Sequence, residues 1–362
     1  MNPSFWRDRH VFVTGHTGFK GSWLCLLLHS FGARVTGFAL EPPTQPSLFS
    51  LARADELVDS VIADIRDLNR LTESLRASQA GVVIHMAAQS IVLSSYDDPA
   101  NTYSTNVMGT VNVLEAIRRV GRGCAVVNVT TDKCYENKGW VWGYRETDPL
   151  GGRDPYSNSK ACAELVAQSY RDSFFPLSRW DQHRVALASA RAGNVIGGGD
   201  WTARQLIPET IAAFLEARPV VLRHSNAIRP WQHVLDCLGG YITLAESLAN
   251  DPKTHSGEWN FGPADADACP VSRVVESLGS LWEIEQPWVQ DQVEHAHEEQ
   301  QLRLDVSKAA SILGWRGRLP IDEALEWVAT WYRDQRAGGD ARSLCNDQIG
   351  RYVTRCVNSE RR

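Results

Sequence analysis

The chain has 362 residues, enough to bury a substantial core as one large domain or two unequal ones. Its hydrophobic content of 43% and its charged content of 22% are ordinary for a soluble globular protein. The net charge of -6 disfavours a nucleic-acid-binding surface, so we expect no nucleic-acid partner.

Cysteine usage and the absence of targeting signals predict a cytoplasmic protein with reduced thiols. The eight cysteines include no close pairs, which argues against a disulfide framework. The N-terminus carries no signal-peptide pattern, and no stretch is long and apolar enough to span a bilayer, so we expect no membrane partner. No Cys/His cluster has metal-ligand spacing, because His295 and His297 are too isolated, and we expect no metal.

A strand, a glycine-rich turn and a helix follow one another near the N-terminus. Residues 9–14 read as a short apolar strand, residues 15–21 as the turn and residues 22–28 as a helix. Glycines let the backbone approach a pyrophosphate, and the free N–H groups of the helix then receive the anion. The spacing is Gly-x-x-Gly-x-x-Gly rather than Gly-x-Gly-x-x-Gly, and the alternative is a plain tight turn. The context favours a dinucleotide site.

Two features near this turn predict that the cofactor is held loosely. An acidic residue near the end of the second strand normally binds the adenine ribose. Here that strand, residues 34–40, ends before Glu41, which is one or two positions late and at best an imperfect substitute. His16 also places bulk in a turn that usually keeps small residues.

Further strands alternate with helices and predict an α/β fold, a Rossmann-like doubly wound parallel sheet. A third strand ends near Asp64, which could contact the adenine edge. A fourth, residues 81–89, contains Ala87 and Ala88, small enough for the backbone to pass close to a cofactor. His85 within that strand reads as a core side chain.

The central strand, residues 125–129, delivers Thr131, Asp132 and Lys133 to a carboxyl end, where open α/β sheets bind ligands. Tyr156 and Lys160 are four residues apart, so on a helix they share one face. A lysine beside a phenol favours phenolate, and we expect the pKa of the tyrosine to fall from about 10 towards neutrality. Tyr-x-x-x-Lys also occurs by chance, and Asp132 could be only a helix N-cap and Lys133 only a solvated charge.

After residue 195 the pattern becomes less regular and predicts a smaller C-terminal α/β domain for the substrate. We expect residues 1–195 and about 228–262 to form the cofactor domain. The substrate domain would then comprise about 196–227 and 263–337, with a polar tail, 338–362, that holds little core. We expect a helix to start near residue 228, and another, opening near residue 302, to belong to the second domain.

Five motifs together resemble the extended short-chain dehydrogenase/reductase family and, within it, the nucleotide-sugar 4,6-dehydratases. The resemblance covers nearly the whole chain. The pair at 132–133 and the run RPWQHV are similar to the branch that acts on CDP-sugars; the related dTDP-glucose enzymes have glutamate where Lys133 stands. The motifs are TGHTGFKG (14–21), TDKCYEN (131–137), GGRDPYSNSK (151–160), RAGNVIGGGDW (191–201) and RPWQHV (229–234).

The resemblance implies an NAD-dependent lyase that acts on CDP-glucose. Tyr156, with Lys160 and Thr131, would remove the proton of the 4-hydroxyl while a hydride passes to NAD⁺. Asp132 as acid and Lys133 as base would then eliminate water across carbons 5 and 6, and the hydride would return to carbon 6. Cofactor-binding positions implied by the resemblance are Thr14, Gly15, His16, Gly18, Phe19, Lys20, Asp64, Ile65, Ala87, Ala88, Gln89, Asn106, Tyr156 and Lys160.

The nucleotide end of the substrate is predicted from fewer signals. Arg229 is a candidate clamp for the diphosphate, because guanidinium binds phosphate oxygens in a fork; a surface ion pair is the alternative. The other substrate-binding candidates are Gln89, Asn194, Arg204 and His233.

Two other functions and an oligomeric state complete the predictions. One alternative is a dehydratase for another nucleotide or a 4-epimerase; the other is a non-catalytic regulator on the same fold. A regulator would tend to lose Tyr156 or Lys160, and both are present. The small and apolar residues of 161–167 suit pairing through the tyrosine-bearing helix, so we expect a homodimer, with a tetramer as the alternative.

Overall fold

The computed structural model describes residues 1–293 and 301–360, and its centre is a seven-stranded parallel sheet. The strand order is β11-β6-β5-β4-β1-β2-β3, so the sheet is doubly wound about β1, and the predicted fold class is confirmed. His295 and His297 lie outside the described residues. The strands of this sheet are β1 (His10–Thr14), β2 (Arg34–Ala39), β3 (Asp59–Ile62), β4 (Val82–His85), β5 (Cys124–Val129), β6 (Val185–Ala192) and β11 (Gly257–Phe261).

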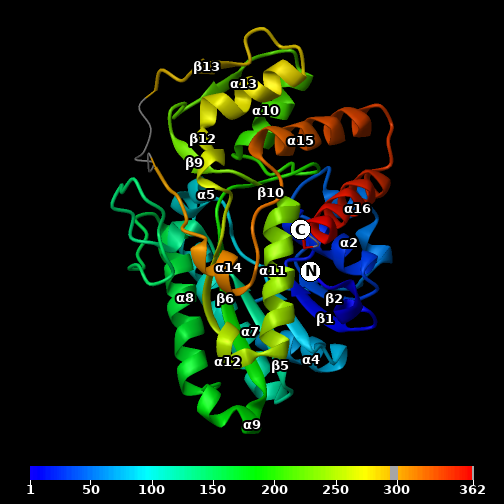
Figure 1. The fold of residues 1–362 in the computed structure, drawn as a ribbon, viewed down its shortest axis with the longest axis vertical. Helices are drawn as coiled ribbons and strands as arrows, with labels where there is room; N and C mark the ends of the chain where they lie inside the picture. The colour runs from blue at the N-terminus through cyan, green and yellow to red at the C-terminus, as the bar shows by residue number, and fades with distance from the viewer. Residues whose placement is uncertain (294–300, 361–362) are drawn as a thin grey trace.

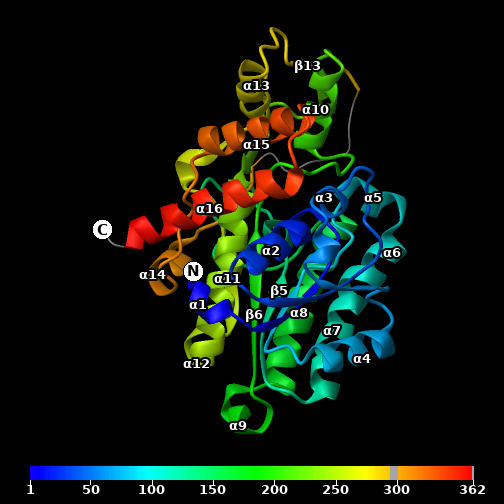
Figure 2. The same ribbon diagram turned by 90° about the vertical axis from the view of Figure 1, so that its right-hand side faces the viewer.

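Both faces of the sheet are covered by helices, which is why its central strands are apolar along their whole length. Alternate side chains of β1 enter different cores: Val11 and Val13 point to one face and Phe12 to the other. The first face packs against α2 (Phe19–Ser30) and α11 (Val234–Asn250). The helices of the second face are α4 (Leu68–Ser78), α7 (Gly109–Val120) and α8 (Pro155–Ser173). Figures 1 and 2 show the two helical layers from perpendicular directions.

A smaller lobe lies beyond one end of the main sheet, at the top of Figure 1. It contains α10 (Leu206–Leu215), α13 (Val271–Leu281) and α15 (Ile321–Arg336). Short strand pairs join its parts, two of them parallel and one antiparallel. These are β7 (Val195–Ile196) with β10 (Gln232–His233), β8 (Val220–Leu222) with β13 (Trp288–Gln290), and β9 (Ile228–Pro230) with β12 (Ala268–Pro270).

Two helix predictions in this half of the chain are wrong. The helix expected from residue 228 begins only at Val234, because residues 228–230 are extended and pair with β12. The helix expected near residue 302 is α14 (Ser307–Ile312), which packs against β11 of the main sheet rather than inside the smaller lobe.

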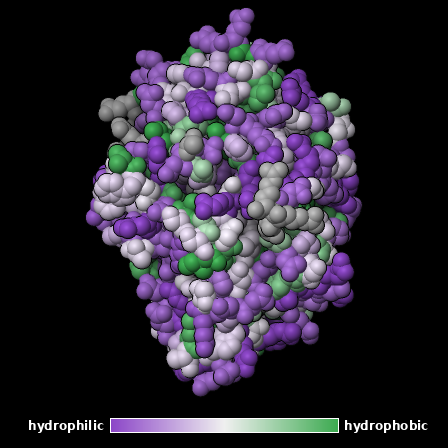
Figure 3. All heavy atoms as spheres, viewed as in Figure 1, coloured by the Kyte–Doolittle hydropathy of each residue, from purple (hydrophilic) through white to green (hydrophobic). Residues whose placement is uncertain are grey.

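The remaining helices are short and lie at the edges of the main elements. They are α1 (Pro3–Trp6), α3 (Leu48–Leu51), α5 (Val92–Asp97), α6 (Pro99–Tyr103), α9 (Trp180–His183) and α12 (Pro252–His255). Within residues 1–293 and 301–360 no helix combines the length and the apolar character that a membrane span requires. Figure 3 shows hydrophilic side chains over most of one face, with hydrophobic ones in small separate groups.

The predicted polar tail is instead a packed helix, so that prediction is wrong. Residues Ala341–Glu360 form α16, which lies against α2 and α15. Cys345, Ile349 and Tyr352 are buried, and the Tyr352 hydroxyl donates a hydrogen bond to Asp236 of α11 at 2.9 Å. These buried positions are three and four residues apart, the spacing of one helical face, and the polar residues between them obscured it. The C-terminus is therefore part of the core that supports α2.

We expect Ile349→Ala to lower the free energy of unfolding by about 2–5 kcal/mol, because it leaves a cavity under α16. Urea denaturation followed by circular dichroism measures the loss. Val357→Ala is the matched control on the same helix: Val357 is 38% exposed, and its truncation should cost less than about 0.5 kcal/mol. Equal effects of the two variants would contradict the packing of this helix.

Candidate active site

The first turn of α8 places Tyr156 and Lys160 at the carboxyl end of β5. Asp154 caps the helix by accepting hydrogen bonds from the Ser157 backbone N–H at 2.9 Å and from the Ser157 hydroxyl at 2.5 Å. Pro155 follows as the first helical residue, where its missing N–H is not needed. Tyr156 and Lys160 are both buried, and the Lys160 ammonium donates to the Val129 carbonyl at 3.2 Å. The predicted helix and its shared face are confirmed.

The residues after β5 form a short 3₁₀ turn, Asp132–Cys134, which presents the other predicted catalytic side chains. Thr131 caps this turn: its hydroxyl accepts from the Lys133 N–H at 3.3 Å and donates to Asp132 Oδ1 at 3.0 Å. Thr131 also hydrogen-bonds Tyr156, which lowers the pKa of that phenol. Thr131, Asp132 and Tyr156 therefore form one connected group, with Lys160 one helical turn away.

The pKa of Tyr156 moves in the direction opposite to the one predicted. Burial raises it, outweighing the hydrogen bond between Thr131 and the phenol, and the nearby Asp132 raises it further. The Lys160 ammonium is directed to the Val129 carbonyl at 3.2 Å and is not among the main causes of the shift. Burial, with a smaller contribution from Lys20, also lowers the pKa of Lys160 to about 8. The protein alone therefore holds the phenol protonated, and a cationic group beside it would be needed to favour phenolate.

Asp132 has the properties of a general acid. It is 2% exposed, and burial raises its pKa more than the attraction of Lys133 and Arg229 lowers it. Its Oδ2 has no hydrogen-bond partner among the described residues. A Cβ atom on Gly193 would come within 3.1 Å of that oxygen and 2.5 Å of the Pro230 ring, so the Gly193 backbone packs closely against the buried carboxyl. Lys133, the predicted base, is half-buried beside it.

The glycine turn has the close approaches that a dinucleotide site requires. Gly15 has a φ of +76° and lies against the Ala87 backbone, where a Cβ atom would be 2.8 Å from the nitrogen. A Cβ atom on Gly21 would be 2.1 Å from the Gly15 carbonyl oxygen. Gly18 caps α2 without a side chain, which leaves the first N–H groups of that helix available to an anion. The Thr14 hydroxyl accepts from the Ala87 N–H at 3.1 Å and so ties the turn to the end of β4.

His16 does not crowd the turn as the sequence suggested, because its ring is directed into the core. It is 0% exposed, lies edge-on to Phe49 and contacts the Ser60 hydroxyl through Nε2 at 2.7 Å. Gly37 of β2 makes room for it, since a Cβ atom there would be 2.3 Å from the ring. Burial lowers the pKa of His16 to about 4, so the ring is neutral. Glu41, one position beyond the exposed Leu40, is itself exposed.

Other predicted cofactor positions form a brace between β4 and α8. Asn106 donates to the Gln89 carbonyl at 2.9 Å and to the Ser159 hydroxyl at 2.8 Å, and it accepts from the Gln89 N–H at 2.8 Å. Asp64 is paired with Arg66, and the hydrogen bond to that guanidinium lowers its pKa. Phe19 starts α2, Ile65 is buried and its carbonyl accepts from the Asn112 side chain at 3.1 Å, and Ala88 lies beyond β4.

His85 has the core role predicted for it. It is buried, contacts the Thr14 hydroxyl at 2.7 Å and the Thr110 hydroxyl at 3.2 Å, and its pKa falls to about 3 through burial.

The five predicted substrate-binding side chains are not equally well placed. Arg229 is 3% exposed on β9 and near enough to Asp132 to lower the pKa of that carboxyl. Asn194 is half-buried, and its backbone carbonyl accepts from the Gln232 N–H at 2.9 Å. Arg204 is exposed and forms a 2.6 Å ion pair with Asp97.

His233 is a core residue, which argues against a role in substrate binding. It is 0% exposed, caps α11 by accepting from the Leu235 N–H at 3.2 Å, and lies edge-on to Trp23 and Trp327. Burial lowers its pKa to about 3. Among the described residues its Nε2 has no hydrogen-bond partner.

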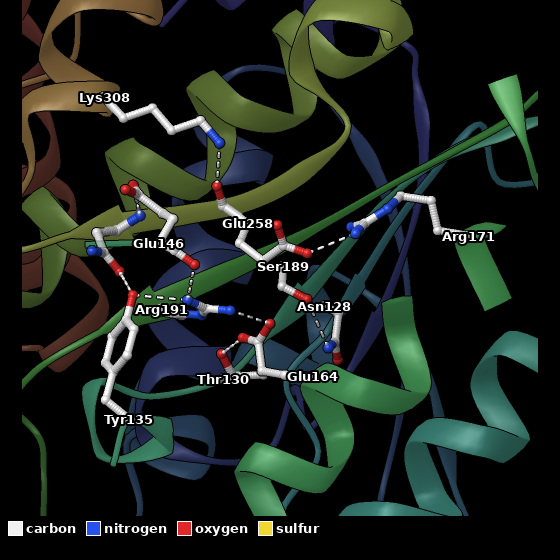
Figure 4. Close-up of polar contacts among 11 residues, drawn as sticks. Asn128, Thr130, Tyr135, Glu146, Glu164, Arg171, Ser189, Arg191, Glu258 and Lys308 are labelled. Atoms are coloured by element: carbon white, nitrogen blue, oxygen red, sulfur yellow. Dashed lines mark hydrogen bonds and ion pairs between the residues drawn. The ribbon is translucent and has the colours of Figure 1, made fainter. Parts of the chain in front are cut away.

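Sequence reasoning missed a buried ion pair behind the site, between Glu164 of α8 and Arg191 of β6 (Figure 4). The only local signal was the position of Glu164, four residues after Lys160 and eight after Tyr156 on the same helical face. Its partner is 27 residues further along the chain, and no short-range pattern links the two.

Comparison with known proteins places this chain among sugar-nucleotide enzymes. Residues 12–328 match the family model described as GDP-mannose 4,6 dehydratase. The chain is 49% identical over 354 residues to the CDP-glucose 4,6-dehydratase of Salmonella typhimurium, covering 98% of this chain and 99% of the relative.

Two solved structures share the fold at lower identity. The UDP-glucose 4-epimerase of Thermotoga maritima, solved with UDP-glucose, has a TM-score of 0.77 and 20% identity, covering 90% of this chain and 99% of its own. The dTDP-glucose 4,6-dehydratase of Bacillus anthracis, solved with NAD, has a TM-score of 0.75 and 22% identity, covering 92% and 99%.

We expect Gly37→Ala to destabilise the protein by about 1–3 kcal/mol, because the new methyl group overlaps the buried His16 ring. Urea denaturation measures the change. Gly350→Ala, at a helical glycine with nothing within 4 Å of an added Cβ, is the control and should be neutral or stabilising. Adding His16→Ala to Gly37→Ala should recover part of the loss; full stability in the single variant would show that the ring lies elsewhere.

Proposed function

We propose that this chain, which belongs to the GDP-mannose 4,6-dehydratase family, converts CDP-glucose to CDP-4-dehydro-6-deoxy-glucose and water. The observation that carries the proposal is the site at the end of β5, where a buried carboxyl with a raised pKa lies beside the Tyr156 phenol. The choice of CDP-glucose rests on the 49% identity with the Salmonella enzyme of that name. The product is a precursor of deoxysugars for surface polysaccharide such as O-antigen in lipopolysaccharide.

NAD is the cofactor that fits the glycine turn. The closely approached Gly15 and Gly21 and the uncapped start of α2 suit a pyrophosphate, and a related dehydratase has been solved with NAD. When bound, NAD⁺ would supply the hydride acceptor for carbon 4 of the sugar and the hydride donor for carbon 6, and its positive charge would favour the Tyr156 phenolate. Lys160 and Asn106 are the predicted cofactor contacts on that side of the site.

Tyr156 is the base of the first step. The phenolate takes the proton of the sugar 4-hydroxyl, and Thr131, hydrogen-bonded to the phenol, holds it in position. Lys160, anchored at the Val129 carbonyl, maintains a positive charge one helical turn from the phenol.

Asp132 and Lys133 carry out the elimination. The carboxyl of Asp132, kept neutral by burial, donates a proton to the departing 6-hydroxyl. Lys133 removes the hydrogen on carbon 5, which the 4-ketone has made acidic. Arg229 is assigned to the substrate diphosphate, with Asn194 and Gln89 as further contacts.

The proposal includes a cytoplasmic homodimer that pairs through α8. Leu165 of α8 is 53% exposed, so this helix offers an apolar contact to a second copy. All eight cysteines are free thiols, as a reducing compartment would keep them.

We expect activity with CDP-glucose and little with the UDP, dTDP or GDP counterparts when the purified chain is assayed against this panel. The product is detected by its absorbance in alkali. Added NAD⁺ should raise the rate, because no acidic side chain at the end of β2 is in register to hold the adenine ribose. A 4-epimerase would instead interconvert the panel sugars without loss of water, and a protein that is fully saturated with NAD as isolated would contradict weak retention.

We expect Lys133→Met to reduce solvent deuterium entry at carbon 5 by about 100-fold or more, the contribution typical of a positioned base. Asp132→Asn should reduce loss of the 6-hydroxyl similarly, and the wild-type rate should fall as the pH rises through the raised pKa of Asp132. Lys253→Met, at an exposed lysine of α12, is the control. Undiminished exchange in Lys133→Met would remove that residue from the role of base.

A further inference from the structure

A buried ion pair lies behind the turn that presents Asp132 and Lys133, which is called the catalytic turn below (Figure 4). The Arg191 guanidinium on β6 donates to Glu164 Oε2 on α8 at 3.0 Å, and the two side chains are 2% and 1% exposed. Neither side chain belongs to the glycine turn or to the groups assigned to the chemistry. A buried pair of this kind often contributes less to stability than apolar residues of the same volume would, so stability alone does not account for it.

The pair holds both ends of the catalytic turn. Thr130, just before the turn, donates a hydrogen bond to Glu164 Oε1. Tyr135, just after it, accepts one from Arg191 Nη1 at 2.8 Å and donates one to Asn260 Oδ1 of β11, also at 2.8 Å. Asp132 and Lys133 therefore lie between two anchors that meet at one ion pair.

The same pair also holds the helix that carries the phenol. Glu164 lies one turn after Lys160 and two turns after Tyr156, so all three side chains leave one face of α8. Fixing the Glu164 carboxylate to Arg191 and to Thr130 sets the distance between this face and the end of β5. The reacting groups come from two separate elements, and this contact determines how those elements meet.

We propose that Glu164 and Arg191 are the positioning pair of the dehydratase site: they hold the 131–133 turn in register with Tyr156 and Lys160 and provide Lys160 with a buried counter-charge. The inference rests on the proposed function. Both residues act through others, because neither touches the groups that exchange protons with the sugar.

The negative charge of Glu164 raises the pKa of Lys160, against other groups that lower it. Burial and Lys20 lower the pKa of Lys160, whereas Glu164 and Cys134 raise it, and the ammonium in turn lowers the pKa of His85. Removing the negative charge at position 164 while keeping the shape should therefore let Lys160 lose its proton at a lower pH.

The first test compares Glu164→Gln with Glu258→Gln. Glu258 forms another ion pair between α8 and the sheet, with Arg171 at 2.7 Å. Within the described part of the chain its side chain makes no hydrogen bond to the catalytic turn, which makes it a matched control. We expect Glu164→Gln to reduce kcat by about 10–100-fold with KM for CDP-glucose within about twofold, since misplacement of about 1 Å can cost 10²-fold. The part of its pH–rate profile that reports Lys160, as distinct from the fall set by Asp132, should move to lower pH, and Glu258→Gln should keep the wild-type profile.

Two further variants separate positioning from folding. Thr130→Val removes one contact of Glu164 and keeps the volume, so it tests the same role if Glu164→Gln fails to fold; it should lower kcat without changing the melting temperature by more than a few degrees. Glu164→Gln combined with Arg191→Gln leaves no unpaired buried charge and should recover stability but not kcat. Wild-type kcat in Thr130→Val or in the stable double variant, or an unshifted pH limb in Glu164→Gln, would overturn the proposal.

The two proposals fail in different ways. If the wild-type chain does not convert CDP-glucose, the proposed function fails for that substrate. The positioning variants are then compared on whichever nucleoside-diphosphate hexose of the panel the wild-type chain converts, where the same changes in kcat and pH profile decide the role of the pair.

Discussion

Desolvation at the carboxyl end of β5 is the constraint on which the rest of the site depends. The sheet, α8 and α11 enclose Asp132, Tyr156 and Lys160 so completely that burial is the largest cause of each pKa shift. Burial favours the neutral acid at Asp132 and the neutral phenol at Tyr156, and it lowers the pKa of Lys160 to about 8. Asp132 is thus ready to donate a proton, whereas the Tyr156 phenolate, which accepts one, has to be stabilised by a cation beside it.

The enclosing structure explains why distant parts of the chain matter to three side chains. α11 and α2 cover one face of the sheet, and α16 packs over α2, with Tyr352 bound to Asp236. On the other face α8 is held at Glu164 by Arg191 and at Ser159 by Asn106. These two contacts hold the helix that carries the phenol toward β6 and toward the segment that follows β4.

The two departures seen near the cofactor turn have different explanations. His16 looked too bulky for a tight turn, yet its neutral ring lies over Gly37 in the core and leaves the turn itself open. Glu41 is exposed beyond the end of β2, as its position in the sequence suggested. Of the two, the missing acidic side chain in register is the one that bears on how firmly a dinucleotide is held.

Local patterns were sufficient for the parallel sheet, the glycine turn and the Tyr156–Lys160 face, because apolar runs, glycine spacing and a four-residue repeat each reflect contacts within a few residues. They were insufficient for α16, because polar residues separate the buried positions of that helix in the sequence. They were also insufficient for His233, which the motif predicted to bind substrate and which the structure shows packed against Trp23 and Trp327. The direction of the Tyr156 pKa and the Glu164–Arg191 pair were settled only by the folded chain. Burial and long-range pairing depend on which segments come to enclose a group, and that is a property of the assembled layers, absent from any short stretch of residues.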